Sequence, residues 1–530
     1  MKKILFNISR ALFIITMSAV LVLVLFFQDR YYACKKSFTF SNITIASIVL
    51  MVGSLLAVFC CWRYSAAGGR VVRGLPASQS SERKYDRAAL CVTVCLLMAE
   101  IYISYNIFST NAWDPGGIWK TAVARYHSDL GWSLGIAHYF SMYPNNVLLL
   151  LLDTFCLKVN GAFGVFQGNY NMMSAIIVDC FAISGACFLV YKVLALHVSR
   201  KFAFGGFLVA VILCGLSPWM SVCYSDSLGI LFPVLTYYLY VKPAKNGRRK
   251  SMERALAVIV CCIGYSIKPQ CVIILIAIVL VELIRLCDGW DLKRLAKTAA
   301  LVALACLCLV INSTMLTKQY ESIGVKLDPE KKFGMTHFFM MGLNEKSGGV
   351  YSSEDVAYSS SFLTSKQRTE GNIAVSIARL REMGPAGYLR HLSRKLLTTY
   401  HDGTFAWGME GGFYIQVVDD ANTRMAPFLK SVYYSDGSRH EWFKIAEQFV
   451  WIAVLMFTFA ASFCKQTEER GAEMNILTLA ILGLTLFQLL FEVRARYLFL
   501  YVPVFCILAT LGFENTLSWI QKRLIKKKEG

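Results

Sequence analysis

Charged residues are scarce in this sequence. Only 17% of its 530 residues are Asp, Glu, Lys or Arg, while 56% are hydrophobic, and a soluble globular protein has about 25% charged residues. This shortage excludes a single soluble domain, a disordered chain and a fibrous repeat. The length allows about a dozen membrane spans of roughly 20 residues each, with residues left over. The composition therefore predicts an all-α polytopic membrane protein.

The sequence also lacks an internal repeat of fixed period, a low-complexity tract, and any cysteine between Lys318 and Lys444. Most of its 18 cysteines lie inside apolar runs, where a thiol behaves as a small hydrophobic side chain. Adjacent cysteines, such as Cys261 and Cys262, lack the spacing of zinc ligands and have no histidines nearby. The cysteines therefore predict neither a disulfide framework nor a zinc site.

The formal net charge is +20, from 54 Lys and Arg against 34 Asp and Glu. The basic residues form short clusters between apolar runs, which is typical of the cytoplasmic loops of membrane proteins. We therefore expect no nucleic-acid partner. The clusters are Lys2 and Lys3; Arg63, Arg70, Arg73, Arg83, Lys84 and Arg87; Lys192, Arg200 and Lys201; Lys242, Lys245, Arg248, Arg249 and Lys250; Arg285, Lys293, Arg294 and Lys297; and Lys522, Arg523, Lys526, Lys527 and Lys528.

Twelve apolar runs are the expected membrane spans. With the N-terminus inside, alternating them across the membrane places every basic cluster and both termini on the cytoplasmic side. No small-residue cleavage site follows Phe27, so we expect the first run to be a retained signal anchor. The runs are Ala11–Phe27, Ile43–Trp62, Ala88–Phe108, Met172–Val190, Phe202–Val222, Leu228–Val241, Ala255–Ile267, Cys271–Leu286, Thr298–Leu316, Phe449–Cys464, Asn475–Phe491 and Tyr497–Phe513.

One further apolar run, Asn145–Lys158, is left out of this count because it is short and carries Asp153. If it crossed, the basic loops at Arg248–Lys250 and Arg285–Lys297 would face outward, against the positive-inside rule. We therefore expect it to lie at the outer interface or to enter the bilayer partway.

This topology divides the chain into four parts. Residues 1–87 hold two membrane helices and a basic cytoplasmic loop, and residues 88–316 form a membrane core with a first outer loop at 109–170. Residues 317–444 are expected to form a larger outer-face domain of helical or mixed structure. Residues 445–530 hold the last membrane helices and a basic cytoplasmic tail. Function is therefore expected on the outer face.

Two carboxylates stand at the outer ends of expected spans. Asp114, in Trp-Asp-Pro-Gly-Gly, is a good helix N-cap before Pro115, and a capping Asp can still present one oxygen to a ligand. Asp226 follows Ser-Val-Cys-Tyr-Ser at the end of a span. Both are candidates for chemistry at the membrane surface.

Three basic residues oppose the positive-inside rule, because the topology places Lys268, Arg494 and Arg496 on the outer side. Snorkelling to lipid headgroups is one explanation. The other is that they bind a lipid-linked phosphate.

Polar groups also stand at the Tyr-Pro-Asn-Asn motif, residues Tyr143 to Asn146, which precedes an apolar helix. The amides of Asn145 and Asn146 can hydrogen-bond sugar hydroxyls or cap that helix. His337 lies beside Met-Met-Gly-Leu-Asn and is the histidine that we expect to bind substrate, although outer polar regions also hold histidines by chance.

The order of these motifs resembles the GT-C superfamily of integral-membrane glycosyltransferases, which take sugars from polyprenyl-phosphate donors. The chain gives an outer-loop Asp, Tyr-Pro-Asn-Asn, a second Asp, an outward Lys-Pro and an Arg-x-Arg-Tyr. More narrowly, it looks like a bacterial family that bears the Tyr-Pro-Asn-Asn motif. The segments Met340–Asn344, Gly348–Tyr351 and Asp402–Phe405 are also similar to that family's outer domain. The resemblance covers residues 88–513, so the first two spans lie outside it.

The resemblance implies a catalytic carboxylate in the first large outer loop, which maps onto Asp114. An ionised Asp can accept the proton of an attacking hydroxyl. Because the leaving group is a phosphate, no second carboxylic acid is required, unlike in glycoside hydrolysis. Lys268, Arg494 and Arg496 can stabilise charge on that phosphate. We expect Asp226 to orient the acceptor or to support Asp114.

We therefore expect a glycosyltransferase that moves a sugar from a polyprenyl-phosphate donor to a cell-envelope glycan or lipid, outside the cell membrane and with inversion. No cofactor is predicted: some GT-C relatives use a divalent metal, for which Asp114 and Asp226 would give only two ligands. One alternative is a transporter or flippase for lipid-linked sugars, a class that favours inverted repeats and ionisable groups at the bilayer midplane. Another is an envelope polysaccharide polymerase or ligase with a lipid-diphosphate donor.

Overall fold

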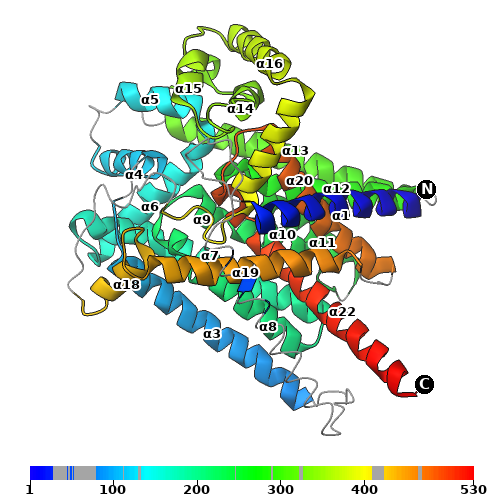
Figure 1. Cartoon of the computed structure of the whole chain (residues 1–530). Coiled ribbons are helices and arrows are strands. Elements are labelled where there is room, and N and C mark those ends of the chain that lie inside the picture. Colours follow the sequence, from blue (N-terminus) through cyan, green and yellow to red (C-terminus); the bar gives the residue numbers. More distant parts are fainter. Residues whose placement is uncertain are drawn as a thin grey trace.

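The computed structural model describes residues 1–27, 79–110, 113–128, 133–244, 246–287, 291–321, 326–408, 423–463 and 468–529, with isolated positions at 45, 48, 49 and 52. The expected span Ile43–Trp62 lies outside these residues, apart from the four isolated positions. Within the described residues the secondary structure is helical and contains no β-strand (Figure 1). The all-helical class agrees with the prediction from composition.

Twenty α-helices and several short turns follow one another along the described chain. Three of the short turns are 3₁₀ turns, namely η2 (Pro144–Asn146), η5 (Pro218–Ser221) and η6 (Pro269–Val272). Another, η4 (Val211–Gly215), is a π-turn. The α-helices are α1 (Lys2–Phe26), α3 (Gln79–Asn106), α4 (Trp113–Tyr126), α5 (Ser133–Met142), α6 (Val147–Phe163), α7 (Met173–His197), α8 (Arg200–Ala210), α9 (Ser225–Gly229), α10 (Leu231–Val241), α11 (Gly247–Ile267), α12 (Ile273–Leu286), α13 (Leu292–Glu321), α14 (Met335–Gly342), α15 (Ser353–Ser360), α16 (Ser365–Tyr400), α18 (Ala426–Tyr433), α19 (His440–Ala461), α20 (Glu468–Leu490), α21 (Arg496–Phe499) and α22 (Val502–Glu529).

Nine helical segments of the described residues are long and apolar enough to cross a membrane. The expected number of about twelve is not confirmed. The run Phe202–Val222 is interrupted by the π-turn η4 and by Pro218, and Leu228–Val241 is divided between α9 and α10. The run Ala255–Ile267 belongs to α11, whose first turns are charged.

The apolar run that begins at Asn145 is longer than we expected. Helix α6 continues past Lys158 and ends only at Gly164, whose φ of 66° stops the helix. Together η2 and α6 make Pro144–Phe163 one of the nine candidate spans. The expectation that this run is short was therefore wrong. Its position at the outer interface, or partway into the bilayer, stays a prediction from the basic loops.

The helices of residues 326–408 gather at one end of the molecule. There α14, α15 and α16 pack against one another, with α5 nearby (Figure 1). Helix α16 is kinked at Gly384, whose φ is 60°, directly before Pro385. Proline disfavours the α conformation in the residue before it, which explains the position of this break.

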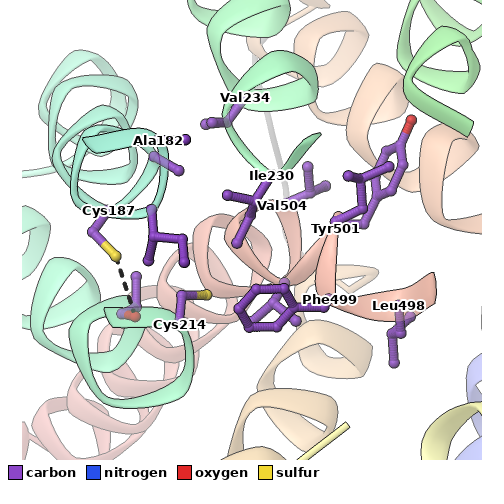
Figure 2. Packing of buried hydrophobic residues seen from close by; sticks show 14 of the residues in the cluster. Ala182, Cys187, Cys214, Ile230, Val234, Leu498, Phe499, Tyr501 and Val504 are labelled. Carbon is purple, nitrogen blue, oxygen red and sulfur yellow. Dashed lines mark hydrogen bonds between the residues drawn. The ribbon is translucent and has the colours of Figure 1, made fainter. Parts of the chain in front are cut away.

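A fully buried apolar core connects the last two helices to the middle of the chain. Figure 2 shows Phe499 of α21 near Ile230, which precedes α10, and near Cys214 of η4. Helix α7 faces the same core through Cys187, whose thiol donates to the Ala210 carbonyl at 3.4 Å. Because these side chains are fully buried, the start of α21 has a fixed position.

Candidate functional site

Three residues that the sequence singled out, Asp226, Lys268 and Arg496, form one buried charge cluster. The Lys268 ammonium donates a hydrogen bond to Oδ1 of Asp226, and Nε of Arg496 lies 3.8 Å from Oδ2. Their exposed fractions are 1%, 5% and 7% for Asp226, Lys268 and Arg496. Two cations therefore face one buried carboxylate.

This charge cluster is assembled from three distant segments. Asp226 lies in α9, Lys268 stands between α11 and η6, and Arg496 begins α21. Gly229 lets α9 approach closely, because a Cβ there would lie 2.6 Å from Cδ1 of Leu500 and 3.8 Å from Cβ of Lys268. A larger residue at this position would require the buried Leu500 side chain or α9 to shift.

Two tyrosine rings border the cations. The Lys268 ammonium lies 4.3 Å from the ring centre of Tyr497 and 5.8 Å from that of Tyr224. The guanidinium carbon of Arg496 lies 5.3 Å from the Tyr224 ring and 5.6 Å from the Tyr497 ring. These distances allow cation–π attraction, which keeps charge stable where little water is available.

Tyr224 also joins this cluster to Asp114. Its hydroxyl donates to Oδ2 of Asp114 at 3.1 Å. Burial, and then the charge of Asp114, raise the pKa of Tyr224 well above its ordinary value, so the hydroxyl keeps its proton. Asp114 is half-buried. The two candidate carboxylates therefore lie on either side of one tyrosine.

Asp114 occupies the first turn of α4, next to a strained residue. Trp113 has a φ of 58°, a conformation that costs a residue other than glycine about 1–2 kcal/mol. We expected Asp114 to be the N-cap; it lies one residue inside the helix as its limits are drawn. Strain of this kind persists only where the surroundings hold the backbone in place.

The Tyr-Pro-Asn-Asn motif reaches Asp114 through Tyr139. The Asn145 amide donates to Oδ1 of Asn146 at 3.1 Å, and the Asn146 amide donates to the Tyr139 hydroxyl at 2.8 Å. Burial, then the charge of Asp114, and then a hydrogen bond to that carboxylate raise the pKa of Tyr139 well above its ordinary value. The buried Asn146 therefore orients a tyrosine, where we had expected it to contact substrate.

Arg494 has a different carboxylate partner from Arg496. Its Nε donates to Oε1 of Glu492 at 3.0 Å, and its guanidinium carbon lies 5.9 Å from the ring centre of Tyr351. Burial, and then the charges of Asp114 and Glu492, raise the pKa values of Tyr351 and Tyr143. Tyr143 and Tyr351 are thus close enough to Asp114 to be affected by its charge.

The two arginines lie in and directly after the segment between α20 and α21, which contacts the loop between α14 and α15. The N–H of Val493 donates to the Gly349 carbonyl at 2.9 Å. Val493 and Ala495 are fully buried and cluster with Val350 and Ala406. Arg494 and Arg496 each follow one of these buried apolar residues in the chain, so the apolar cluster fixes the backbone that carries both arginines.

A buried lysine, which the sequence did not reveal, supports the same segment. The ammonium of Lys395 in α16 donates to the Gly342 carbonyl at 3.0 Å and to the Phe491 carbonyl at 2.6 Å. The side chain is fully buried, and this burial lowers the pKa of Lys395 to about 7, although Glu492 acts in the opposite direction. Lys395 thus joins α14 to the segment with the arginines.

His337 lies apart from the charge cluster. Its Nδ1 pairs with Oγ of Ser359 at 2.7 Å, and its ring stacks on Phe333 with 4.0 Å between ring centres. Phe333 in turn packs edge-on against Tyr143 at 5.3 Å. His337 has no exposed surface, and burial lowers its pKa to about 4. The structure therefore places it in the packing between α14 and α15, and its contact with substrate stays a prediction.

Asp114 and Asp226 were also considered as metal ligands. Within the described part of the chain, no group of three or more His, Cys, Asp or Glu side chains is placed to hold a metal ion. Asp226 already faces Lys268 and Arg496. It would have to leave these cations in order to bind a metal.

Comparison with solved structures gives a distant match to the archaeal oligosaccharyltransferase AglB from Archaeoglobus fulgidus, which was solved in complex with an inhibitory peptide and a dolichol-phosphate. The TM-score is 0.34 and the identity 11%, and the match covers 82% of this chain and 51% of that one, so the chain spans about half the length of AglB. No curated protein matches. Residues 1–517 match the family described as conserved hypothetical integral membrane protein. Because this match covers nearly the whole sequence, the chain belongs to that family of integral membrane proteins.

Proposed function

We propose that this membrane protein is a glycosyltransferase that takes a sugar from a polyprenyl-phosphate donor and transfers it to a cell-envelope glycan or lipid on the outer face. One observation carries the proposal. A buried cluster of two cations and one carboxylate, made by Lys268, Arg496 and Asp226, adjoins the half-buried carboxylate of Asp114 through Tyr224.

The cations fit the leaving group of such a reaction. A sugar linked to a lipid through one phosphate carries one negative charge, which Lys268 and Arg496 would attract. Lys268 and Arg496 would stabilise the second negative charge that develops when the sugar leaves. Asp226 then has a role that we did not expect: it is the counter-ion that keeps two cations stable before the donor arrives.

Asp114 fits the role of base. Tyr224 donates a hydrogen bond to one of its oxygens, and a carboxylate has further lone pairs for an acceptor hydroxyl. In the proposed step the acceptor oxygen attacks the anomeric carbon as its proton passes to Asp114. The bond from that carbon to the phosphate oxygen breaks, and the phosphate leaves with the electron pair. One displacement of this kind inverts the anomeric carbon.

One observation favours transport of lipid-linked sugars as a second function. Asp153 in α6 and Asp179 in α7 are 1% and 2% exposed, and Oδ1 of Asp153 accepts from the Cys223 thiol at 3.3 Å. Carboxylates buried among membrane helices often serve ion or substrate pathways. Cys223 lies next to Tyr224, so these acids adjoin the same charge cluster.

A transfer assay with purified full-length protein tests the proposal. The donors would be a labelled sugar on a polyprenyl monophosphate and the same sugar on a polyprenyl diphosphate, offered with an envelope extract as acceptor. We expect transfer from the monophosphate only. Transfer from the diphosphate alone would favour a polymerase or ligase. Movement of labelled lipid across proteoliposomes, without transfer from either donor, would favour the transporter.

A further inference from the structure

A second charge cluster lies far from the candidate site, around Glu282 of α12. The Tyr240 hydroxyl donates to Oε1 of this buried glutamate. Nitrogens of Arg254 and Arg285 lie 3.7 and 3.4 Å from Oε1, and Nε of Arg294 lies 3.8 Å from Oε2. Helices α11, α12 and α13 each supply one of the arginines.

This arginine cluster has more positive charge than its glutamate can balance. Three guanidinium groups face one carboxylate, which leaves a formal charge of +2. Each guanidinium has five N–H donors, many more than two carboxylate oxygens can accept. The Lys250 ammonium donates to the carbonyls of Tyr240 and Lys242 nearby. Burial, and then Arg254, lower the pKa of Lys250, while Glu253 and Glu473 act in the opposite direction.

The cluster is accessible from outside the protein. The side chains of Arg254, Arg285 and Arg294 are 25%, 21% and 37% exposed, whereas that of Glu282 is only 4% exposed. An anion that approaches the surface would therefore meet the guanidinium groups before the carboxylate.

The surroundings of the arginine cluster are those of a membrane surface. A helix rises about 1.5 Å per residue, so Arg254 lies roughly 20 Å along α11 from Lys268. Over that length the three helices expose apolar side chains. These include Leu256 and Ile259 of α11, Leu280 and Leu283 of α12, and Val302 of α13. Acyl chains could cover this surface while a headgroup meets the arginines.

We propose that Arg254, Arg285 and Arg294 bind the phosphate of an anionic phospholipid, at the end of the membrane helices opposite to the candidate site. Phosphate oxygens accept several N–H donors at once, and guanidinium matches this geometry better than ammonium does. A basic pocket between membrane helices is a common headgroup site. We commit to a lipid rather than a soluble phosphate because apolar helix surface adjoins the arginines.

Native mass spectrometry of the full-length protein in detergent tests this inference, with dioleoyl phosphatidylglycerol and dioleoyl phosphatidylcholine as probes. We expect phosphatidylglycerol to bind about 10-fold more tightly than phosphatidylcholine. Arg294→Gln removes the most exposed guanidinium and should weaken phosphatidylglycerol binding about 10-fold, since a hydrogen bond to a charged group is lost. Glu282→Gln should act in the opposite direction, because it removes the competing negative charge and keeps an oxygen for Tyr240.

Arg249→Gln is the matched control. Arg249 is on the same helix as Arg254, but its Nε lies 3.5 Å from Oε1 of a different acid, Glu253, so binding should not change. Equal binding of the two lipids would overturn the inference, and so would Arg294→Gln binding like the parent. Displacement of the lipid by millimolar inorganic phosphate would also contradict it and indicate a soluble-anion site. The melting temperature of each variant shows whether it is folded, and none of these outcomes depends on glycosyl transfer.

Discussion

Asp226→Asn tests whether Asp226 is the counter-ion of Lys268 and Arg496. The substitution keeps the size of the side chain and removes its charge. In the parent, one buried carboxylate faces the two cations. In the variant, two positive charges remain in a region where all three side chains are less than 10% exposed.

The expected loss of stability is large. Breaking a buried ion pair by removal of one partner costs about 3–5 kcal/mol, because the remaining charge is left without compensation. In the double variant Asp226→Asn/Lys268→Met, one of the two unbalanced cations is gone as well. We therefore expect the double variant to recover about 2 kcal/mol relative to Asp226→Asn, a coupling of the size found between residues in contact.

Thermal unfolding of the purified protein in detergent measures this effect, with and without a polyprenyl monophosphate. The lipid phosphate supplies a negative charge in place of Asp226, so it should raise the melting temperature of Asp226→Asn more than that of the parent. Lys268→Met alone is the control for lost packing. If Asp226→Asn melts like the parent, or if the double variant is the least stable of the set, the counter-ion role is refuted.

Three further predictions concern the support of the site and its topology. Gly229→Ala should lower donor affinity several-fold, because a Cβ at Gly229 collides with Leu500. Gly205→Ala is the control and should leave donor affinity unchanged, because a Cβ there meets no atom within 4 Å. Equal donor binding by both variants would contradict this prediction. The pKa of Lys395 is lowered to about 7 in the folded protein. Between about pH 7 and 10.5 the unfolded chain therefore holds a proton that the folded chain lacks. The free energy of unfolding then rises with pH, by at most about 1.4 kcal/mol per pH unit. The Lys395→Met variant should lack this rise in stability with pH. If the melting temperatures of variant and parent change with pH in parallel, the prediction for Lys395 is wrong. A cysteine placed at Arg248–Lys250 should resist a membrane-impermeant label on intact cells, and labelling from outside would reverse the predicted topology.

The sequence predicted the charged members of the candidate site better than their partners. Asp114, Lys268 and Arg496 stood out because charges are rare at the outer ends of apolar spans. Tyr224 did not stand out, although it lies two residues before Asp226, because interfacial tyrosines are common in membrane proteins. Its role depends on the contact with Asp114, about 110 residues away in the chain.

Other features depend on packing that no local pattern contains. Lys395 occupies a helix with several basic residues, and only the approach of Phe491 shows that its ammonium is buried. His337 looked like a ligand because of its neighbours in sequence, yet the stacking of Phe333 covers it. The spans were predicted where the helix is continuous, and less well where a π-turn or a proline interrupts it, as in Phe202–Val222.

Asp114→Asn is the measurement that tests the proposed mechanism most directly. Asn keeps the size of the side chain and an oxygen for the Tyr224 hydrogen bond, but it loses the negative charge and nearly all affinity for a proton. Asp436→Asn is the matched control, because Asp436 lies at an exposed position after α18. Transfer of labelled sugar from a polyprenyl monophosphate should fall by about 10²–10⁴-fold in Asp114→Asn, while donor binding and melting temperature stay close to those of the parent. Turnover within a few-fold of the parent and of Asp436→Asn would contradict the role of Asp114 as the base.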